Sequence, residues 1–181
     1  MTGIPTSTAP PSTPSVREQN RKIKWFKQTS LIPFARRALI YEVNSRRPQL
    51  VLLQPKDDFD PACGAFASTD DLDMDVWFGG SDSYSISSVD HIPGTHAFLL
   101  NGFDVVALRL ADTEPVVAPA NDAVERQFSL TWHGNLLVVK RGRYDRSRAI
   151  SITPSEISTI NALVECWLGI RLKECSTSDS E

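Results

Sequence analysis

Residues 152–172, ITPSEISTINALVECWLGIRL, contain the most strongly specified element of the chain. The residues at 153–156 start a helix: a threonine caps free N–H groups, a proline stands where no N–H is needed, and a glutamate completes a capping box. Apolar residues then recur at helical spacing and leave only a narrow polar strip. A helix this apolar needs protein on nearly every side. The stretch therefore predicts a largely buried helix over residues 154–172.

Upstream of that helix, short β-rich runs follow one another and are separated by turn signals. These predicted strands are Ala38–Val43, Gln49–Gln54, Met74–Phe78, Tyr84–Val89, His96–Leu100, Phe103–Leu110, Gln127–Trp132, Leu136–Arg141 and Arg148–Ile152. The dipeptide Asn101-Gly102 predicts a type I′ hairpin, because both residues tolerate positive φ. Val105–Leu108 and Leu136–Val139 are apolar on both faces, so these strands need cover on each side or a very tight barrel. The predicted fold class is α+β and mainly antiparallel β, a curled or closed β-barrel-like meander with a largely buried C-terminal helix.

Length and composition predict one globular domain with unstructured ends. The chain has 181 residues, of which 41% are apolar and 23% charged, which suits a single core. Residues 1–16 are rich in Thr, Pro and Ser and are predicted to be a disordered tail. Residues 17–37 form a basic segment with interspersed aromatics, residues 38–173 form the β-rich domain, and residues 174–181 are a second disordered tail.

The same composition bears on the compartment. No apolar run approaches the ~18–20 residues that a membrane-spanning helix needs. The first residues lack a basic start and an apolar core, so no signal peptide is expected. The cysteines Cys63, Cys166 and Cys175 show neither disulfide nor zinc spacing, and Cys166 is predicted to be a small core residue. We therefore expect a reducing, intracellular and cytoplasmic location, peripheral at a membrane.

Charge is segregated along the chain. Residues 1–56 carry ten Lys and Arg against two acidic residues, whereas residues 57–125 carry one Arg against fourteen acidic residues. A basic stretch with interspersed aromatics is typical of contact with anionic lipid headgroups. The predicted anionic-ligand-binding residues are Lys22, Lys24, Lys27, Arg36 and Arg37 in the first cluster, and Lys140, Arg141, Arg143 and Arg146 in the second. The alternative is that the basic residues pair with the acidic block inside the fold. Nucleic acid is disfavoured, since no recognised binding motif is present.

No catalytic or metal site is predicted. The histidines His91, His96 and His133 do not form an i, i+4 metal pair. The acidic run Asp71, Asp73, Asp75 and Asp82 imitates the spacing of a calcium loop, but Val76 stands where a glycine is required. The chain has no nucleophile elbow, no phosphate-binding loop and no dinucleotide fingerprint, so no cofactor is expected. An enzyme would need one of the histidines beside Cys63 or a carboxylate.

The order of elements resembles that of the tubby-like superfamily, in particular its small fungal members. The likeness rests on the early strand Ala38–Val43, on Gln49–Leu53 after it, and on Arg146–Ile152 running into the helix that ends at Leu172; it covers roughly residues 30–173. It implies a β-barrel whose lumen holds the C-terminal helix and, as in better-known members, binding to phosphoinositide headgroups. A pleckstrin-homology-like barrel, in which the helix plugs one end, is the structural alternative.

The predicted function is a non-enzymatic intracellular binding module that contacts anionic membrane lipid through its basic clusters. Two alternatives stay open. One is a protein-interaction adaptor that uses an exposed apolar strand face. The other is an enzyme whose site contains a histidine with a cysteine or carboxylate.

Overall fold

The computed structural model describes residues 32–62, 67–109 and 118–178. The chain clusters into two compact units, Met1–Pro33 and Phe34–Glu181. In the first unit only Ile32 and Pro33 are described, so the account below concerns the second unit. The predicted tail at 1–16, most of the basic segment and the final residues 179–181 lie outside the described part.

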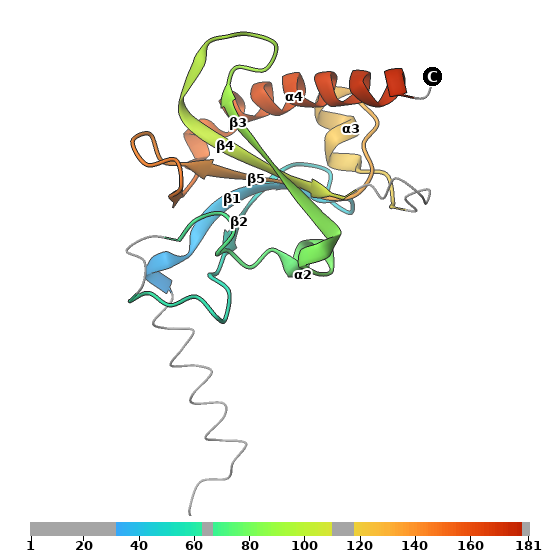
Figure 1. Ribbon diagram of the computed structural model, residues 1–181. Coiled ribbons are helices and arrows are strands. Elements are labelled where there is room, and N and C mark those ends of the chain that lie inside the picture. The colour runs from blue at the N-terminus through green and yellow to red at the C-terminus, as the bar shows by residue number, and fades with distance from the viewer. Residues whose placement is uncertain (1–31, 63–66, 110–117, 179–181) are drawn as a thin grey trace, which may run out of the picture. The chain divides into compact units, whose positions relative to one another are not determined.

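The second unit is an α+β fold with a six-stranded antiparallel sheet and a long C-terminal helix (Figure 1). The strands are β1 (Arg36–Tyr41), β2 (Gln49–Leu53), β3 (Tyr84–His91), β4 (Phe98–Leu108), β5 (Leu136–Arg141) and β6 (Ala149–Ile150). The helices are α2 (Asp75–Phe78), α3 (Asp122–Phe128) and α4 (Ile157–Ser178), with short 3-10 turns η1 (Ile32–Phe34), η2 (Ser81–Ser83) and η3 (Pro154–Glu156).

The sheet is open, and the expected barrel-like meander is wrong. The strand order is β2-β1-β5-β4-β3, with β6 paired to the end of β5. Within the described residues β2 and β3 are the two edges, and no pairing joins them. The strand order is also not that of a meander, because β1 lies between β2 and β5, and β2 does not pair with β3, the next strand in sequence. The open sheet therefore lacks the barrel that the tubby-like resemblance implies.

The strands that are apolar on both faces were expected to need either cover on each side or a very tight barrel. Cover on each side is confirmed. Along β5, Leu136 and Val138 belong to one buried cluster, whereas Leu137 and Val139 belong to another. Because successive side chains of a strand point to opposite faces, β5 has a core on both sides. We call these faces the helix face and the loop face.

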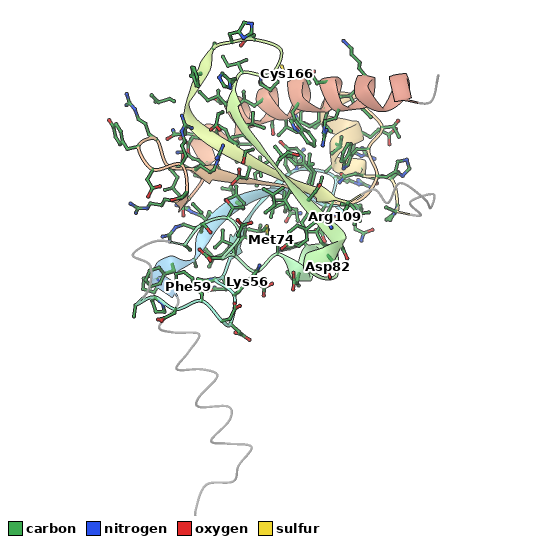
Figure 2. All side chains as sticks on the ribbon, in the orientation of Figure 1. Lys56, Phe59, Met74, Asp82, Arg109 and Cys166 are labelled. Atoms are coloured by element: carbon green, nitrogen blue, oxygen red, sulfur yellow. The ribbon has the colours of Figure 1, made fainter. Side chains whose placement is uncertain are left out.

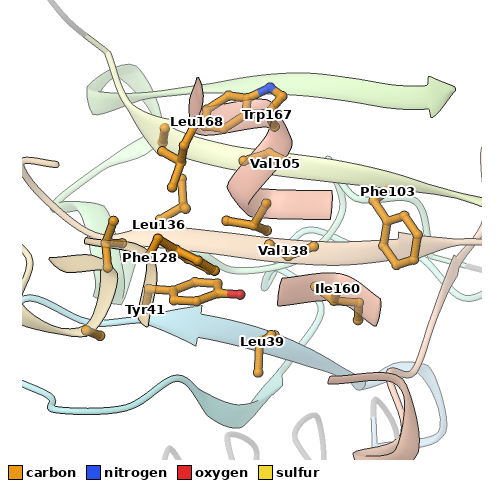
Figure 3. Close-up of a cluster of buried hydrophobic side chains, with 14 of the residues drawn as sticks. Leu39, Tyr41, Phe103, Val105, Phe128, Leu136, Val138, Ile160, Trp167 and Leu168 are labelled. Carbon is orange, nitrogen blue, oxygen red and sulfur yellow. The ribbon is translucent and has the colours of Figure 1, made fainter. Parts of the chain in front are cut away.

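The helix face packs against α4 and α3 (Figures 1 and 3). Helix α4 buries one stripe, made of Ile160, Val164, Trp167 and Leu168, against Val105 and its neighbours in the sheet. The capping box is confirmed, since Thr153 and Glu156 exchange hydrogen bonds at the start of the helix.

The prediction that α4 is nearly enclosed is wrong, because an open sheet covers only one side of it. Cys166 is exposed on the outer side of α4, so its predicted core role is wrong as well (Figure 2). Asn161, on the polar strip, accepts a 2.6 Å hydrogen bond from the buried hydroxyl of Tyr41, and burial raises the pKa of that tyrosine.

The loop face is covered by an irregular segment rather than by long helices. Residues 54–62 and 67–80 form this cover, and Leu72, Met74 and Phe78 are buried in it against the sheet; Met74 is labelled in Figure 2. The expected strand at Met74–Phe78 is wrong, since Asp75–Phe78 form helix α2, which ends at Gly79 with φ 81°. The spacing explains the difference: Met74 and Phe78 lie four residues apart and are both buried, which is a helical period.

Two other local expectations are wrong, the hairpin turn at Asn101-Gly102 and the strand at Gln127–Trp132. Strand β4 runs straight through Asn101-Gly102, and the hairpin turn lies instead at Ile92–Thr95, where the Thr95 N–H donates to the carbonyl of Ile92. Its Pro93-Gly94 pair, with Gly94 at φ 78°, suits a type II turn.

The expected strand at Gln127–Trp132 is replaced in its first part by α3. The Asn121 side chain caps that helix by accepting from the Val124 N–H, and Ser129 at φ 57° ends it. Since asparagine is a favoured N-cap, the local hydrogen bond outweighs the alternating polar pattern of the sequence.

Candidate binding sites at one end of the sheet

Strand direction brings the described members of both predicted basic clusters to one end of the sheet. β1 begins at Arg36 and Arg37, and antiparallel β5, with Val138 opposite Leu39, ends at Arg141. The loop from 142 to 148 follows on the left of Figure 1. We call this the cationic end; its basic residues are Arg36, Arg37, Lys140, Arg141, Arg143, Arg146 and Arg148. Lys22, Lys24 and Lys27 lie outside the described residues.

Lys140 points to the helix face and is engaged inside the fold. Its Nζ lies 2.5 Å from Oε1 of Glu156, and both side chains are mostly buried. Burial by itself raises the pKa of Glu156, but hydrogen bonds from Lys140 and Thr153 outweigh it and lower that pKa overall. One carboxylate therefore caps α4 and neutralises the cation at the end of β5, so Lys140 is not available to an external anion.

Arg141 points to the loop face and is also paired. Its Nη2 donates to Oδ1 of Asp90 at 2.7 Å, and its Nε lies 3.1 Å from Oδ1 of Asp104. Arg146 approaches the same Asp90 oxygen at 3.4 Å and donates from Nη2 to the carbonyl of Leu99. The alternative of pairing with the acidic block is confirmed for these two arginines.

Asp104 is the centre of this cluster. It is 4% exposed, and its Oδ2 accepts from Thr69 at 2.5 Å while its Oδ1 accepts from Ser88 at 2.7 Å. A buried carboxylate needs such partners to offset its desolvation. Gly102 makes room for the guanidinium groups, because a Cβ there would lie 2.6 Å from Asp90, 2.7 Å from Arg146 and 2.9 Å from Arg141. Gly102, which the sequence pattern predicts to be a turn residue, therefore allows close packing of these side chains instead.

A polar cleft of about 420 Å³ opens beside Asp104 on the loop face. It is lined by Ser68, Thr69, Asp70, Ile86, Ser88, Asp104, Arg141, Arg146 and Ser147. The lining contains two cations and two carboxylates, so it has no surplus of positive charge. The cleft draws on the 67–70 segment, β3, β4, β5 and the loop that follows β5.

The two arginines that begin β1 differ in exposure. Arg36 is partly buried and donates from Nε to the carbonyl of Ala149 at 2.9 Å. Burial and then the charge of Arg148 lower the pKa of Arg36. Arg37 is exposed, and its backbone N–H donates to the hydroxyl of Ser151.

Arg143 is exposed at the tip of the 142–148 loop and lies over the ring of Tyr144 at 5.2 Å. That tyrosine is 91% exposed. The loop is tightly closed, since the Gly142 N–H donates to the carbonyl of Arg148 and a Cβ on Gly142 would lie 2.6 Å from the carbonyl oxygen of Asp145. Arg143 and Tyr144 are therefore presented on a constrained loop.

The β3–β4 hairpin extends past the end of β5 beside that loop. Phe103 lies opposite Lys140, so the residues before it project beyond the cationic end, and Arg146 ties the loop to Leu99. Phe98 is 75% and Leu100 is 61% exposed, and His91 stacks on Phe98 with ring centres 4.0 Å apart. Large apolar side chains and cations thus share one end of the molecule.

The residues considered for catalysis are not assembled in the described part of the chain. His91, His96 and His133 are exposed, and none lines the cleft. Cys63 lies outside the described residues. In the ranges that the structure describes, no group of three His, Cys, Asp or Glu side chains is arranged to hold a metal ion. Over the same ranges, no helix combines the length and apolar character needed to span a bilayer.

The acids and hydroxyls of the cleft were not predicted. The sequence does contain a sign that Asp104 is paired. It is the only charge within the apolar run at 103–108, and a strand covered on both faces cannot leave a charge unpaired. No sequence pattern identifies Thr69 and Ser88 as its partners, since they reach Asp104 from other elements and Thr69 precedes it by 35 residues.

Comparisons of the chain with protein-family models, with curated proteins and with solved structures find no match.

Proposed function

We propose that this protein is a non-enzymatic, intracellular binding module that contacts anionic lipid headgroups, phosphoinositides among them, through its cationic end. The observation that carries the proposal is the exposure of Phe98 and Tyr144 at the end of the sheet that also bears Arg37 and Arg143. Apolar and aromatic side chains beside cations suit the interface between headgroups and acyl chains.

The ion pairs decide which cations of this end can contact lipid headgroups directly. Lys140, Arg141 and Arg146 hold Glu156, Asp90 and Asp104, so they shape the surface rather than bind lipid directly. Arg143 and Arg37 supply the direct electrostatic attraction, about 1 kcal/mol for each cation near an anionic surface. Phe98, Leu100 and Tyr144 supply apolar insertion. Lys22, Lys24 and Lys27 belong to the proposal on the strength of the sequence alone.

Vesicle co-sedimentation tests this proposal. The full chain is expected to pellet with vesicles containing phosphatidylserine and to do so less as salt rises. Arg143→Glu and Phe98→Ser are each expected to reduce the bound fraction. The matched control is Arg46→Glu, which makes the same charge change at an exposed residue of the β1–β2 turn, at the opposite end of β1.

The outcomes separate the parts of the proposal. Loss of binding only when Lys22, Lys24 and Lys27 are reversed would move the contact to the N-terminal segment. Equal loss from Arg46→Glu would reduce the effect to net charge. No pelleting at low salt would remove lipid contact altogether.

A protein-interaction adaptor is the second candidate, and the same exposed apolar pair supports it. Both sheet faces are largely covered. Among the described strands the large exposed apolar residues are Leu52 on β2 and the pair Phe98 and Leu100, which lies on the part of β4 that projects beyond β5. An adaptor predicts that Phe98→Ser leaves the weak vesicle binding of the cations unchanged.

A further inference from the structure

The cleft on the loop face has a hydrogen-bonding character that the cationic end as a whole does not share. Each of the four hydroxyl groups that line the cleft donates its single proton in a hydrogen bond to a carboxylate. Thr69 and Ser88 donate to Asp104, Ser68 donates to Asp71, and Ser147 donates to Asp145. Since a hydroxyl has one proton and two lone pairs, these oxygens offer only acceptors to anything that enters.

The guanidinium groups of the cleft do not make it an anion site. Arg141 faces Asp90 and Asp104, and Arg146 faces Asp90, so the positive charge is already balanced by carboxylates inside the fold. A multiply charged anion would meet Asp70 and Asp104 as well as the arginines. Arg146 Nη2 donates to Leu99, whereas its buried Nη1 lies 3.4 Å from Asp90 and makes no hydrogen bond within the described residues, so its N–H groups are left to offer to a ligand.

A fitting ligand therefore brings several hydrogen-bond donors, at least one acceptor and no net charge. Its donors meet the oxygens of Ser68, Ser88 and Ser147, and its acceptor meets Arg146. The volume of about 420 Å³ lies in the range of roughly 300–1,000 Å³ typical of small-molecule sites. Ile86 supplies an apolar patch in the lining.

We propose that this cleft binds a small neutral polyhydroxylated molecule, such as a sugar or a sugar alcohol. Hydroxyl groups of the ligand donate to the committed serine and threonine oxygens and accept from Arg146. The fixed Asp104 cluster keeps those oxygens oriented, and Gly102 keeps the guanidinium groups in place. This site uses side chains other than Phe98, Tyr144 and Arg143, so ligand binding in the cleft and lipid contact can be tested independently.

Chemical-shift mapping of the isotope-labelled full chain tests the proposal. Glucose and mannitol serve as neutral probes, with inorganic phosphate and spermidine as charged ones. The neutral probes are expected to shift the amide signals of Thr69, Ser88 and Ser147 saturably, with the millimolar Kd expected for a ligand of this size. The charged probes are expected to leave those signals in place.

Matched variants on β3 sharpen the test. Ser88→Ala is expected to weaken binding about fivefold or more, the loss of one good hydrogen bond. Ser87→Ala makes the same change on the opposite face of the strand and is expected to bind normally. Ser88→Thr keeps the hydroxyl and is expected to restore binding, which a merely structural effect of Ser88→Ala would not require. Gly102→Ala, which displaces Arg141 and Arg146, is expected to weaken binding too.

Three results would overturn the proposal. They are shifts produced by phosphate or spermidine but not by the polyols, no saturable shift with any probe, and equal losses for Ser87→Ala and Ser88→Ala.

Discussion

The two faces of the sheet are buried to a similar degree by covers of different kinds. On the helix face, Ile160, Val164 and Trp167 of one long helix lie against the strands. On the loop face, Leu72, Met74 and Phe78 come from a segment that is mostly irregular. Burial of a strand therefore depends on whether apolar atoms cover it, and not on the regularity of the element that supplies them.

The end of β5 shows the same contrast in charge. Lys140 and Arg141 are consecutive, so they point to opposite faces, and each is neutralised by what covers its own face. Lys140 meets Glu156 at the start of the helical cover, and Arg141 meets Asp90 and Asp104 from neighbouring strands. The helix face thus closes over its ion pair, whereas the loop face leaves a cleft beside its own.

The largest effect is expected on the helix face. Trp167→Ala removes a side chain that is 8% exposed and packs on Trp132 with ring centres 5.8 Å apart. The free energy of unfolding should fall by about 3–5 kcal/mol, because a helix against a sheet collapses poorly into the cavity. Denaturant unfolding measures this. Cys166→Ser, at the exposed neighbouring position, should change it by less than about 0.5 kcal/mol. Equal values for both variants would contradict the packing described for α4.

The charged cluster of the loop face comes next. Asp104→Ala leaves Arg141, Thr69 and Ser88 without their shared acceptor. We expect a loss of about 3 kcal/mol, the low end for breaking a buried pair, because Asp90 still neutralises Arg141. Asp82→Ala, an exposed acid in the 3-10 turn before β3, is the control. A loss below about 0.5 kcal/mol for Asp104→Ala would mean that the cluster is solvated.

Truncating a core residue of the irregular cover should cost less stability than truncating a core residue of the helix face. Met74→Ala is expected to lower the free energy of unfolding by about 2–3 kcal/mol, since the irregular segment around Met74, residues 67–80, relaxes into the space more easily than a long helix does. Val76→Ala, 77% exposed on the short helix that begins directly after Met74, is the control. A cost for Met74→Ala as large as that for Trp167→Ala would show that the irregular segment is as rigid as α4.

The smallest effect concerns the pH dependence of the helix start. The pKa of Glu156 is lowered in the folded state, so its stabilising contribution is complete above its unfolded pKa, near 4.5, and is lost as pH falls through the lower folded value. Glu156→Gln should cost about 1.5 kcal/mol at neutral pH, because Lys140 and Thr153 donate to different carboxylate oxygens and the single amide oxygen can accept from only one of them. Its stability should also fall less steeply below pH ~4.5 than that of the unsubstituted protein. Glu165→Gln, exposed on α4, should leave the slope unchanged, and the same slope for both would contradict the assignment.

These contrasts explain which parts of the molecule the sequence predicted. The helix at 154–172 and strands at 38–43, 49–54, 84–89 and 136–141 follow from local periodicity and capping, and each is present near its predicted bounds. The cover of the loop face was not predicted, because Leu72 and Met74 are buried by contacts with distant strands, and the four-residue spacing of Met74 and Phe78 was interpreted as a strand.

The candidate sites illustrate the same limit of local patterns. The cations were correctly noted as clusters, but their partners were not, since Asp90 lies 51 residues from Arg141 in sequence. Asn101-Gly102 has the best local turn signal, yet the hairpin turn lies at Ile92–Thr95, and Gly102 instead packs closely against the guanidinium groups of Arg141 and Arg146. The strongest local turn signal therefore did not predict where the hairpin turns.

The most direct test of the open, two-faced sheet is amide hydrogen exchange along β3. The Arg109 N–H bonds the carbonyl of Ser83, and the pairs of an antiparallel ladder alternate, so the amides of Ser85 and Ser87 point to β4 and those of Ile86 and Ser88 point outward. The account predicts slow exchange for the first pair and fast exchange for the second. Slow exchange at all four amides would mean that another strand pairs with β3, as in a closed barrel, and would contradict it.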